Sequence, residues 1–271
     1  MPRLQVGALI VDYQEAGTGL PVIFIPGITE YKEAFLFQYR GLQDSYHVIG
    51  HDVRRGLKRA ADYTLELLTE DLKQLLEALR LSSAVICGHS FGGLIAMQFA
   101  LQFPEETKAL VLVSSFPAAP DAPPERFLGG ISSAGHPFHT SLRARVAVQM
   151  TRWFGRRTAG ALTKESEVSA VRMLARQAVR TSPSTIAQRM RIIQKADFRT
   201  ALPAILAPTL IIAGAKDRGF FLSCAQHLYE GIPNASLEVI DGGGHFCFLT
   251  KHDQFNAAVD DFLTQRLAEM A

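Results

Sequence analysis

The sequence predicts an α/β fold with a mainly parallel sheet and an inserted helical segment over one end of it. Three observations lead to this prediction. Short apolar runs such as Val22–Ile25 and Ala84–Cys87 are typical of parallel strands buried on both faces. Segments with apolar residues at helical spacing alternate with these runs, which indicates helices on both faces of the sheet. From Phe116 to about Ala204 the alternation stops, and helical patterns follow a stretch rich in Pro, Ala and Gly.

The individual elements follow from the same patterns. The expected strands are Gln5–Glu15 (one or two antiparallel strands), Val22–Ile25, His47–Gly50, Ala84–Cys87, Ala109–Val113, Thr209–Ala213 and Leu237–Ile240. The expected helices are Tyr31–Leu42, Thr64 (as cap) to Arg80, Phe91–Phe103, Leu142–Phe154, Lys164–Thr181, Ser184–Lys195, Phe221–Glu230 and Gln254–Ala268. We therefore predict a core domain formed by residues 1–116 and 205–271, with residues 117–204 as a helical cap insertion.

Composition excludes several classes of protein. The chain is 48% hydrophobic and 20% charged, as expected of a globular protein with a substantial core. No apolar run reaches the roughly 18–20 residues that a membrane-spanning helix needs, and the first residues lack the apolar segment of a secretory signal. The 3 cysteines are too few and too scattered for a disulfide framework or a zinc site. We predict a cytoplasmic protein with no metal, no organic cofactor and no nucleic-acid partner.

The clearest motif is Gly88-His89-Ser90-Phe91-Gly92, which stands between an expected strand and an expected helix. In this context a G-x-S-x-G sequence forms a sharp turn that exposes the serine hydroxyl at the carboxyl edge of the sheet. Gly88 and Gly92 are small because a side chain at either position would collide with neighbouring backbone. The motif predicts Ser90 as a nucleophile, with the amino terminus of the next helix pointing at it.

A serine nucleophile needs a base and an acid that orients the base. Of the 8 histidines, His245 follows the last strand on a glycine-rich loop, and we predict it as the base. Asp217 follows an earlier strand and completes the chain order Ser…Asp…His, so we predict it as the acid. Asp241 lies too close to His245 in sequence to turn back onto it. His89 is expected to point away from the site.

The tetrahedral intermediate of acyl transfer also needs hydrogen-bond donors for its oxyanion. We predict the backbone N–H groups of Phe91, which follows the nucleophile, and Ile28, in the loop after the strand Val22–Ile25. The apolar pocket for the acyl group is predicted from five side chains that lie near these groups or on the first cap helix: Ile28, Phe91, Leu94, Phe246 and Trp153.

Along nearly its whole length the sequence resembles the α/β-hydrolase superfamily, in the esterase- and lipase-like branch with a helical cap. The matching stretches are Phe24–Ile28, Tyr63–Leu79, Gly88–Gly93, Phe103–Glu105, Leu110–Leu112, Gly214–Asp217 and Gly244-His245. The resemblance implies an eight-stranded, mostly parallel sheet with an inserted helical cap. Members with an aspartate nucleophile are disfavoured because position 90 is Ser. One departure concerns the oxyanion loop, which usually reads His-Gly and here reads Pro26-Gly27.

The insertion is strongly basic. Residues 141–200 contain 13 Lys or Arg against 3 Asp or Glu, while the whole chain has a net charge of +2. Two interpretations stay open: the arginines form a solvated outer face, or they attract an anionic substrate, an acyl carrier or an acidic membrane surface. Enzymes similar to the pimeloyl carrier-protein methyl esterases use a basic cap in the second way. His136 and His139 lack partners at ligand spacing, so no metal site is predicted there.

Together the residues and the resemblance predict a serine hydrolase that cleaves a small or medium carboxylic ester or thioester through an acyl-enzyme, like a carboxylesterase. Two alternatives remain at this point. One is a C–C bond hydrolase of ring-cleavage products, which uses the same three residues. The other is a small-molecule receptor on the same fold.

Overall fold

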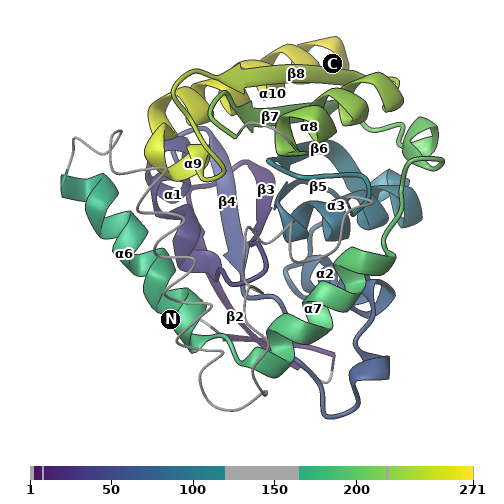
Figure 1. The fold of residues 1–271 in the computed structure, drawn as a ribbon. Helices are drawn as coiled ribbons and strands as arrows, with labels where there is room; N and C mark the ends of the chain where they lie inside the picture. Colours follow the sequence, from purple (N-terminus) through teal and green to yellow (C-terminus); the bar gives the residue numbers. More distant parts are fainter. Residues whose placement is uncertain (1–2, 8, 120–164, 218–219, 271) are drawn as a thin grey trace.

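A computed structural model describes residues 3–7, 9–119, 165–217 and 220–270, and one sheet runs through this part of the chain (Figure 1). The sheet has eight strands in the order β1-β2-β4-β3-β5-β6-β7-β8. The pairs β1–β2 and β2–β4 are antiparallel, and every other neighbouring pair is parallel. The strands are β1 (Arg3–Val6), β2 (Leu9–Ala16), β3 (Leu20–Ile25), β4 (Tyr46–His51), β5 (Ala84–His89), β6 (Thr107–Val113), β7 (Thr209–Gly214) and β8 (Ala235–Ile240). The predicted eight-stranded, mostly parallel fold is confirmed.

Strand β5 shows why wholly apolar runs predict central strands. All six of its residues are buried, and successive side chains enter opposite cores because side chains alternate along a strand. Ile86 packs on one face of the sheet, whereas Val85 and Cys87 pack on the other. A strand with two buried faces therefore favours apolar residues at successive positions, as in Ala84–Cys87.

Helices cover both faces of the sheet (Figure 1). Helices α2 (Leu65–Ala78), α3 (Phe91–Gln102) and α8 (Phe220–Gly231) contribute to the first core, and α1 (Leu36–Leu42), α9 (Cys247–Thr250) and α10 (His252–Met270) contribute to the second. Short 3₁₀ turns occur at Lys32–Phe35, Ala60–Asp62, Pro104–Glu106 and Leu202–Ala204. As predicted, Thr64 caps α2, since its side-chain oxygen accepts a hydrogen bond from the Leu67 N–H.

Two elements differ from the sequence prediction. The expected helix Tyr31–Leu42 begins as a 3₁₀ turn, and its Lys32 N–H donates to the Asp52 carboxylate instead of entering an α-helix. Helix α9 was not predicted because four residues are too few to show a helical period.

Two described helices lie within the predicted insertion, α6 (Glu165–Arg180) and α7 (Pro183–Lys195), and the expected helix Leu142–Phe154 lies outside the described residues. Segments at both ends of this insertion meet, because Ala118 forms a β-bridge with Asp197 and the Phe198 N–H donates to the Pro117 carbonyl at 2.7 Å. The division into core and cap stays a prediction. Within the described part of the chain, no helix combines the length and apolar character needed to cross a bilayer.

Candidate active site

The turn after β5 holds Ser90 in an unusual backbone conformation, with φ 52° and ψ −113°. A non-glycine residue with positive φ is strained and persists only where its surroundings enforce it. Here the Ser90 N–H donates to the Val113 carbonyl at 2.9 Å, and the Ser115 hydroxyl donates to the Ser90 carbonyl at 3.0 Å. A Cβ on Gly88 would lie 2.4 Å from the Gly92 carbonyl oxygen. The glycines of the motif therefore permit the close approach that the sequence analysis expected.

The structure brings Asp217 and His245 together. The His245 Nδ1 atom lies 2.9 Å from the Asp217 Oδ2 atom, and the Asp217 side chain is 1% exposed. The two loops that carry them are joined by backbone hydrogen bonds, such as that from the Lys216 N–H to the Gly243 carbonyl at 2.7 Å. Because β5, β7 and β8 run parallel, Ser90, Asp217 and His245 all follow strand ends at one edge of the sheet.

A second histidine–carboxylate pair lies beside the first, and sequence reasoning missed it. The His89 Nδ1 atom lies 2.9 Å from Glu30 Oε2, and its Nε2 atom lies 2.9 Å from the His245 carbonyl oxygen. Since a carbonyl only accepts, Nε2 must carry a proton. The Gly27 N–H donates to the same Glu30 oxygen at 3.0 Å. His89 thus connects the loop after β3 to the loop of His245, and no sequence pattern joined these three segments.

The loop anchored by Glu30 is the predicted oxyanion loop. Ile28 lies in it, after β3, and Phe91 is the first residue of α3. Helix α3 approaches this loop so closely that a Cβ on Gly92 would lie 2.3 Å from the Ile25 carbonyl oxygen. Within the described residues, neither the Ile28 N–H nor the Phe91 N–H donates a hydrogen bond. Free amides at the amino end of a helix are suited to an anionic oxygen.

The predicted pocket residues fall into three groups. Ile28 is partly buried, and Phe246 packs edge-on against the His245 ring at 5.1 Å between centroids. Phe91 and Leu94 are fully buried in the core of the sheet's α3 face. Trp153 lies outside the described residues, as do His136 and His139. An aromatic neighbour that was not predicted, Phe221 of α8, lies 4.3 Å from the His245 ring centre.

The surroundings of Asp217 are apolar as well as buried. Burial raises the pKa of the nearby Cys247 thiol to about 12, and the negative charge of Asp217 adds to the shift. The thiol is therefore neutral near pH 7 and does not compete as an anion with Asp217. A buried carboxylate stabilises an adjacent imidazolium more strongly than an exposed one, because water screens the interaction less.

Comparisons with known proteins identify the family to which this fold belongs. Residues 21–252 match a family described as the alpha/beta hydrolase fold. The chain is 28% identical to the "Putative carbamate hydrolase RutD" of Klebsiella pneumoniae, over 92% of the chain and 93% of that protein. It is 28% identical to 3-oxoadipate enol-lactonase 2 of Acinetobacter baylyi, over 80% and 79%. Among solved structures it is similar to Est816, an N-acyl homoserine lactone degrading enzyme, with a TM-score of 0.74 and 26% identity, covering 96% of this chain and 100% of that one.

Proposed function

Because the chain is a hydrolase that belongs to the α/β-hydrolase fold family, we propose that it cleaves a carboxylic ester or thioester by acyl transfer to Ser90. The observation that carries the proposal is the 2.9 Å contact between His245 Nδ1 and buried Asp217, at the same sheet edge as the strained serine turn. A carboxylate on Nδ1 fixes the proton there and leaves Nε2 as the basic atom that a serine hydroxyl requires.

In the proposed reaction, His245 takes the Ser90 proton as the hydroxyl oxygen attacks the carbonyl carbon. The Ile28 and Phe91 amides donate to the resulting oxyanion. His245 then gives its proton to the departing alcohol or thiol, and an acyl-enzyme remains. A water molecule, deprotonated by His245, attacks that ester and restores Ser90.

The substrate class rests on the site and on the relatives. The relatives named above are described as acting on lactones and a carbamate, all of which present a carbonyl carbon bonded to a leaving heteroatom. The rings of Phe221 and Phe246 flank the His245 ring, so an apolar acyl group suits this side of the site. We propose a small or medium apolar acyl chain on an ester, a lactone or a thioester.

The test is hydrolysis of p-nitrophenyl esters with acyl chains of two to twelve carbons, with wild type and Ser90→Ala side by side. We expect a length optimum in wild type and a loss of about 10⁴-fold or more in the variant. Turnover that survives in folded Ser90→Ala would contradict the proposal. Activity on ring-cleavage diketones without activity on any ester would favour the C–C hydrolase instead.

The basic cap supports a narrower proposal about charge. Arg172 and Arg176 of α6 and Arg191 of α7 are exposed, and none of the three has an ion pair among the described residues. We propose that they attract an anionic substrate or acyl carrier from solution. Raising salt from low to physiological should then raise KM for an anionic ester and leave KM for its neutral analogue unchanged, because salt screens exposed charges. An equal response of both esters would contradict it.

A further inference from the structure

Helix α7 buries one arginine while its neighbour two residues away faces solvent. Arg189 is 3% exposed, whereas Arg191 is exposed. Arg189 has no carboxylate partner in the described residues, and neutral oxygens satisfy its guanidinium instead. It donates to the carbonyls of Ile28 (2.7 Å), Val53 (3.0 Å) and Arg54 (3.2 Å), and its Nε donates to the Tyr63 hydroxyl (3.2 Å).

Two of its contacts involve the residues whose amides we assign to the oxyanion. The Ile28 carbonyl accepts the shortest hydrogen bond, and the guanidinium carbon lies 5.7 Å from the centre of the Phe91 ring. Holding the Ile28 carbonyl fixes ψ of Ile28, and this limits how the adjoining peptide that carries the Ile28 N–H can rotate. A planar fork with five donors can hold several carbonyls at once, which an ammonium group cannot do in the same geometry.

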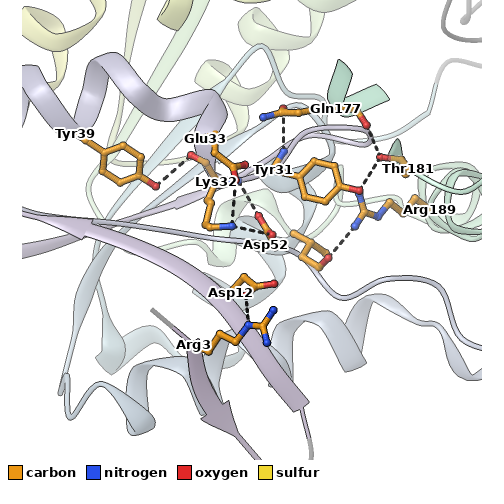
Figure 2. Close-up of polar contacts among 11 residues, drawn as sticks. Arg3, Asp12, Tyr31, Lys32, Glu33, Tyr39, Asp52, Gln177, Thr181 and Arg189 are labelled. Atoms are coloured by element: carbon orange, nitrogen blue, oxygen red, sulfur yellow. Dashed lines mark hydrogen bonds and ion pairs between the residues drawn. The ribbon is translucent and has the colours of Figure 1, made fainter. Parts of the chain in front are cut away.

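The cap helices hold the rest of this loop in the same way (Figure 2). The Tyr31 N–H donates to the Gln177 side chain of α6 at 3.2 Å, and the Thr181 hydroxyl lies 3.3 Å from the Thr29 carbonyl. Figure 2 shows Tyr31, Gln177, Thr181 and Arg189 grouped together, beside the Lys32–Asp52 pair. The oxyanion loop is therefore hydrogen-bonded to α6, α7 and the turn between them through Ile28, Thr29 and Tyr31.

We propose that Arg189 is a positioning residue that sets the Ile28 amide for the oxyanion, so that docking of the cap helix and assembly of the oxyanion hole are one event. The inference rests on the proposed acyl transfer at Ser90. Removing an oxyanion donor outright costs about 10²–10³ in rate. Releasing the loop that carries the donor should cost less, on the order of 10- to 100-fold in kcat, with KM changed by less than about 3-fold.

The same helix offers a matched control for docking alone. The Gln188 side chain accepts from the Leu57 N–H at 2.9 Å and donates to the Leu57 carbonyl at 2.8 Å. It therefore ties α7 to the loop after β4 and not to the oxyanion loop. Gln194→Ala, at an exposed position of the same helix, serves as the second control and should leave activity unchanged.

The experiment compares Arg189→Lys, Gln188→Ala and Gln194→Ala with wild type, after melting curves establish that each variant folds. Two readouts are measured: kcat and KM on the best p-nitrophenyl ester, and affinity for a trifluoromethyl ketone relative to its methyl ketone. The fluorinated ketone adds to a serine and forms an oxyanion, whereas the methyl ketone reports ground-state binding. We expect Arg189→Lys to lower kcat and the affinity ratio by the same factor, and Gln188→Ala to change neither by more than about 3-fold.

A milder variant covers the case in which Arg189→Lys does not fold. Tyr63→Phe removes one acceptor of the guanidinium and leaves Arg189 in place. We expect Tyr63→Phe to lower kcat by 2- to 5-fold and to lower the affinity for the trifluoromethyl ketone, relative to the methyl ketone, by the same factor. Unchanged kcat in folded Arg189→Lys or Tyr63→Phe, or an equal loss in Gln188→Ala, would overturn this inference while leaving the acyl transfer intact. Wild type that neither turns over esters nor binds the fluorinated ketone would overturn both.

Discussion

The two histidine–carboxylate pairs at the sheet edge use the same contact in different surroundings. His245 and His89 each place Nδ1 2.9 Å from a carboxylate oxygen, of Asp217 and Glu30 respectively, and their ring centres lie 4.9 Å apart. The His89 side chain is fully buried, and its Nε2 proton is committed to the His245 carbonyl. The His245 side chain is 10% exposed and follows the last strand on a loop. The second nitrogen of His89 is therefore committed to a structural contact, whereas we propose the second nitrogen of His245 as the base.

The environment of the carboxylates separates the pairs further. Glu30 accepts from the Gly27 N–H through the same oxygen that faces His89 Nδ1, so one buried oxygen contacts two nitrogen atoms. The Asp217 Oδ1 atom has no hydrogen-bond partner in the described structure. A third pair, His47 with Glu15 at 2.8 Å, stands at the surface with side chains 23% and 41% exposed. The same histidine–carboxylate contact can therefore be tested in three settings: a proposed catalytic pair (His245–Asp217), a buried structural pair (His89–Glu30) and a surface pair (His47–Glu15).

The largest expected effect is on the pair assigned to chemistry. His245→Gln should lower kcat by about 10⁴-fold or more because no other group takes the Ser90 proton, and Asp217→Asn should follow closely by favouring the wrong tautomer. Steady-state hydrolysis of the best ester measures both. Urea unfolding should show a much smaller change in His245→Gln than in His89→Gln. Activity above one part in a hundred in His245→Gln would remove the distinction between the two pairs.

The next effect concerns the buried pair. In Glu30→Gln, a neutral amide replaces the carboxyl group whose Oε2 atom faces both His89 Nδ1 and the Gly27 N–H. The amide oxygen keeps both contacts only if His89 stays doubly protonated without a counter-charge, and the amide nitrogen cannot accept from the Gly27 N–H, so the buried pair is weakened in either case. We expect the free energy of unfolding to fall by about 1–3 kcal/mol. We also expect a loss of kcat on the order of tenfold through the loosened oxyanion loop, well below the loss expected in His245→Gln. Urea denaturation and kcat measure these separately. Unchanged stability would show that this pair is not a structural tie.

A buried histidine without a carboxylate partner in the described part of the chain, His51, is expected to make the stability of the protein depend on pH. His51 ends β4, its Nε2 has no hydrogen-bond partner in the described residues, and burial lowers its pKa to about 4. Between pH 6.5 and 4 the unfolded chain binds a proton that the folded chain does not, so stability falls as pH falls. Protonation of His51 in the unfolded chain lowers the free energy of unfolding by at most about 1.4 kcal/mol for each pH unit below 6.5. Above pH 6.5 this loss of stability disappears.

The measurement is urea unfolding of wild type and His51→Gln at pH 7.5 and pH 5. The difference between the two proteins should shrink by about 1–2 kcal/mol at the lower pH, because only wild type has this histidine to protonate on unfolding. His47→Gln controls for an exposed histidine. A difference that is constant with pH would contradict the assignment of the acid sensitivity to His51.

The smallest effect belongs to the surface pair. His47→Gln should change the free energy of unfolding by less than about 0.5 kcal/mol, because water and salt already screen the contact with Glu15. In 0.5 M NaCl the change should vanish. A loss comparable to that of Glu30→Gln would mean that burial does not decide what a histidine–carboxylate contact contributes.

The sequence prediction was accurate for features that depend on residues close together in the chain, and it missed several contacts between residues far apart. Strand β5 and helix α2 were predicted because each has an apolar pattern that is complete within a few neighbouring positions. Burial on both faces of the strand requires a run of apolar residues, and burial on one face of the helix requires apolar residues at helical spacing. The turn at Ser90 was readable because its glycines and serine are adjacent. Asp217 and His245 were predicted from their order and from the strands before them, and the structure brings them to 2.9 Å.

The groups that were missed are joined only in space. Glu30 and His89 are 59 residues apart, and Ile28 and Arg189 are 161 apart. In the sequence Arg189 resembled the other cap arginines, and nothing near it marked it as buried. Glu30 stood in a loop where the usual His-Gly was missing, and only the folded structure shows its carboxylate holding the Gly27 amide.

By itself the sequence determined the sheet, its helices and the order of the groups at its carboxyl edge, because apolar periodicity and turn residues act locally. Tertiary structure alone decided that His89 faces Glu30 and that Arg189 leaves the surface to hold the loop of Ile28. These choices depend on where a buried donor finds an acceptor. A buried polar group must find such a partner or lose stability, and the partner can come from any distance along the chain.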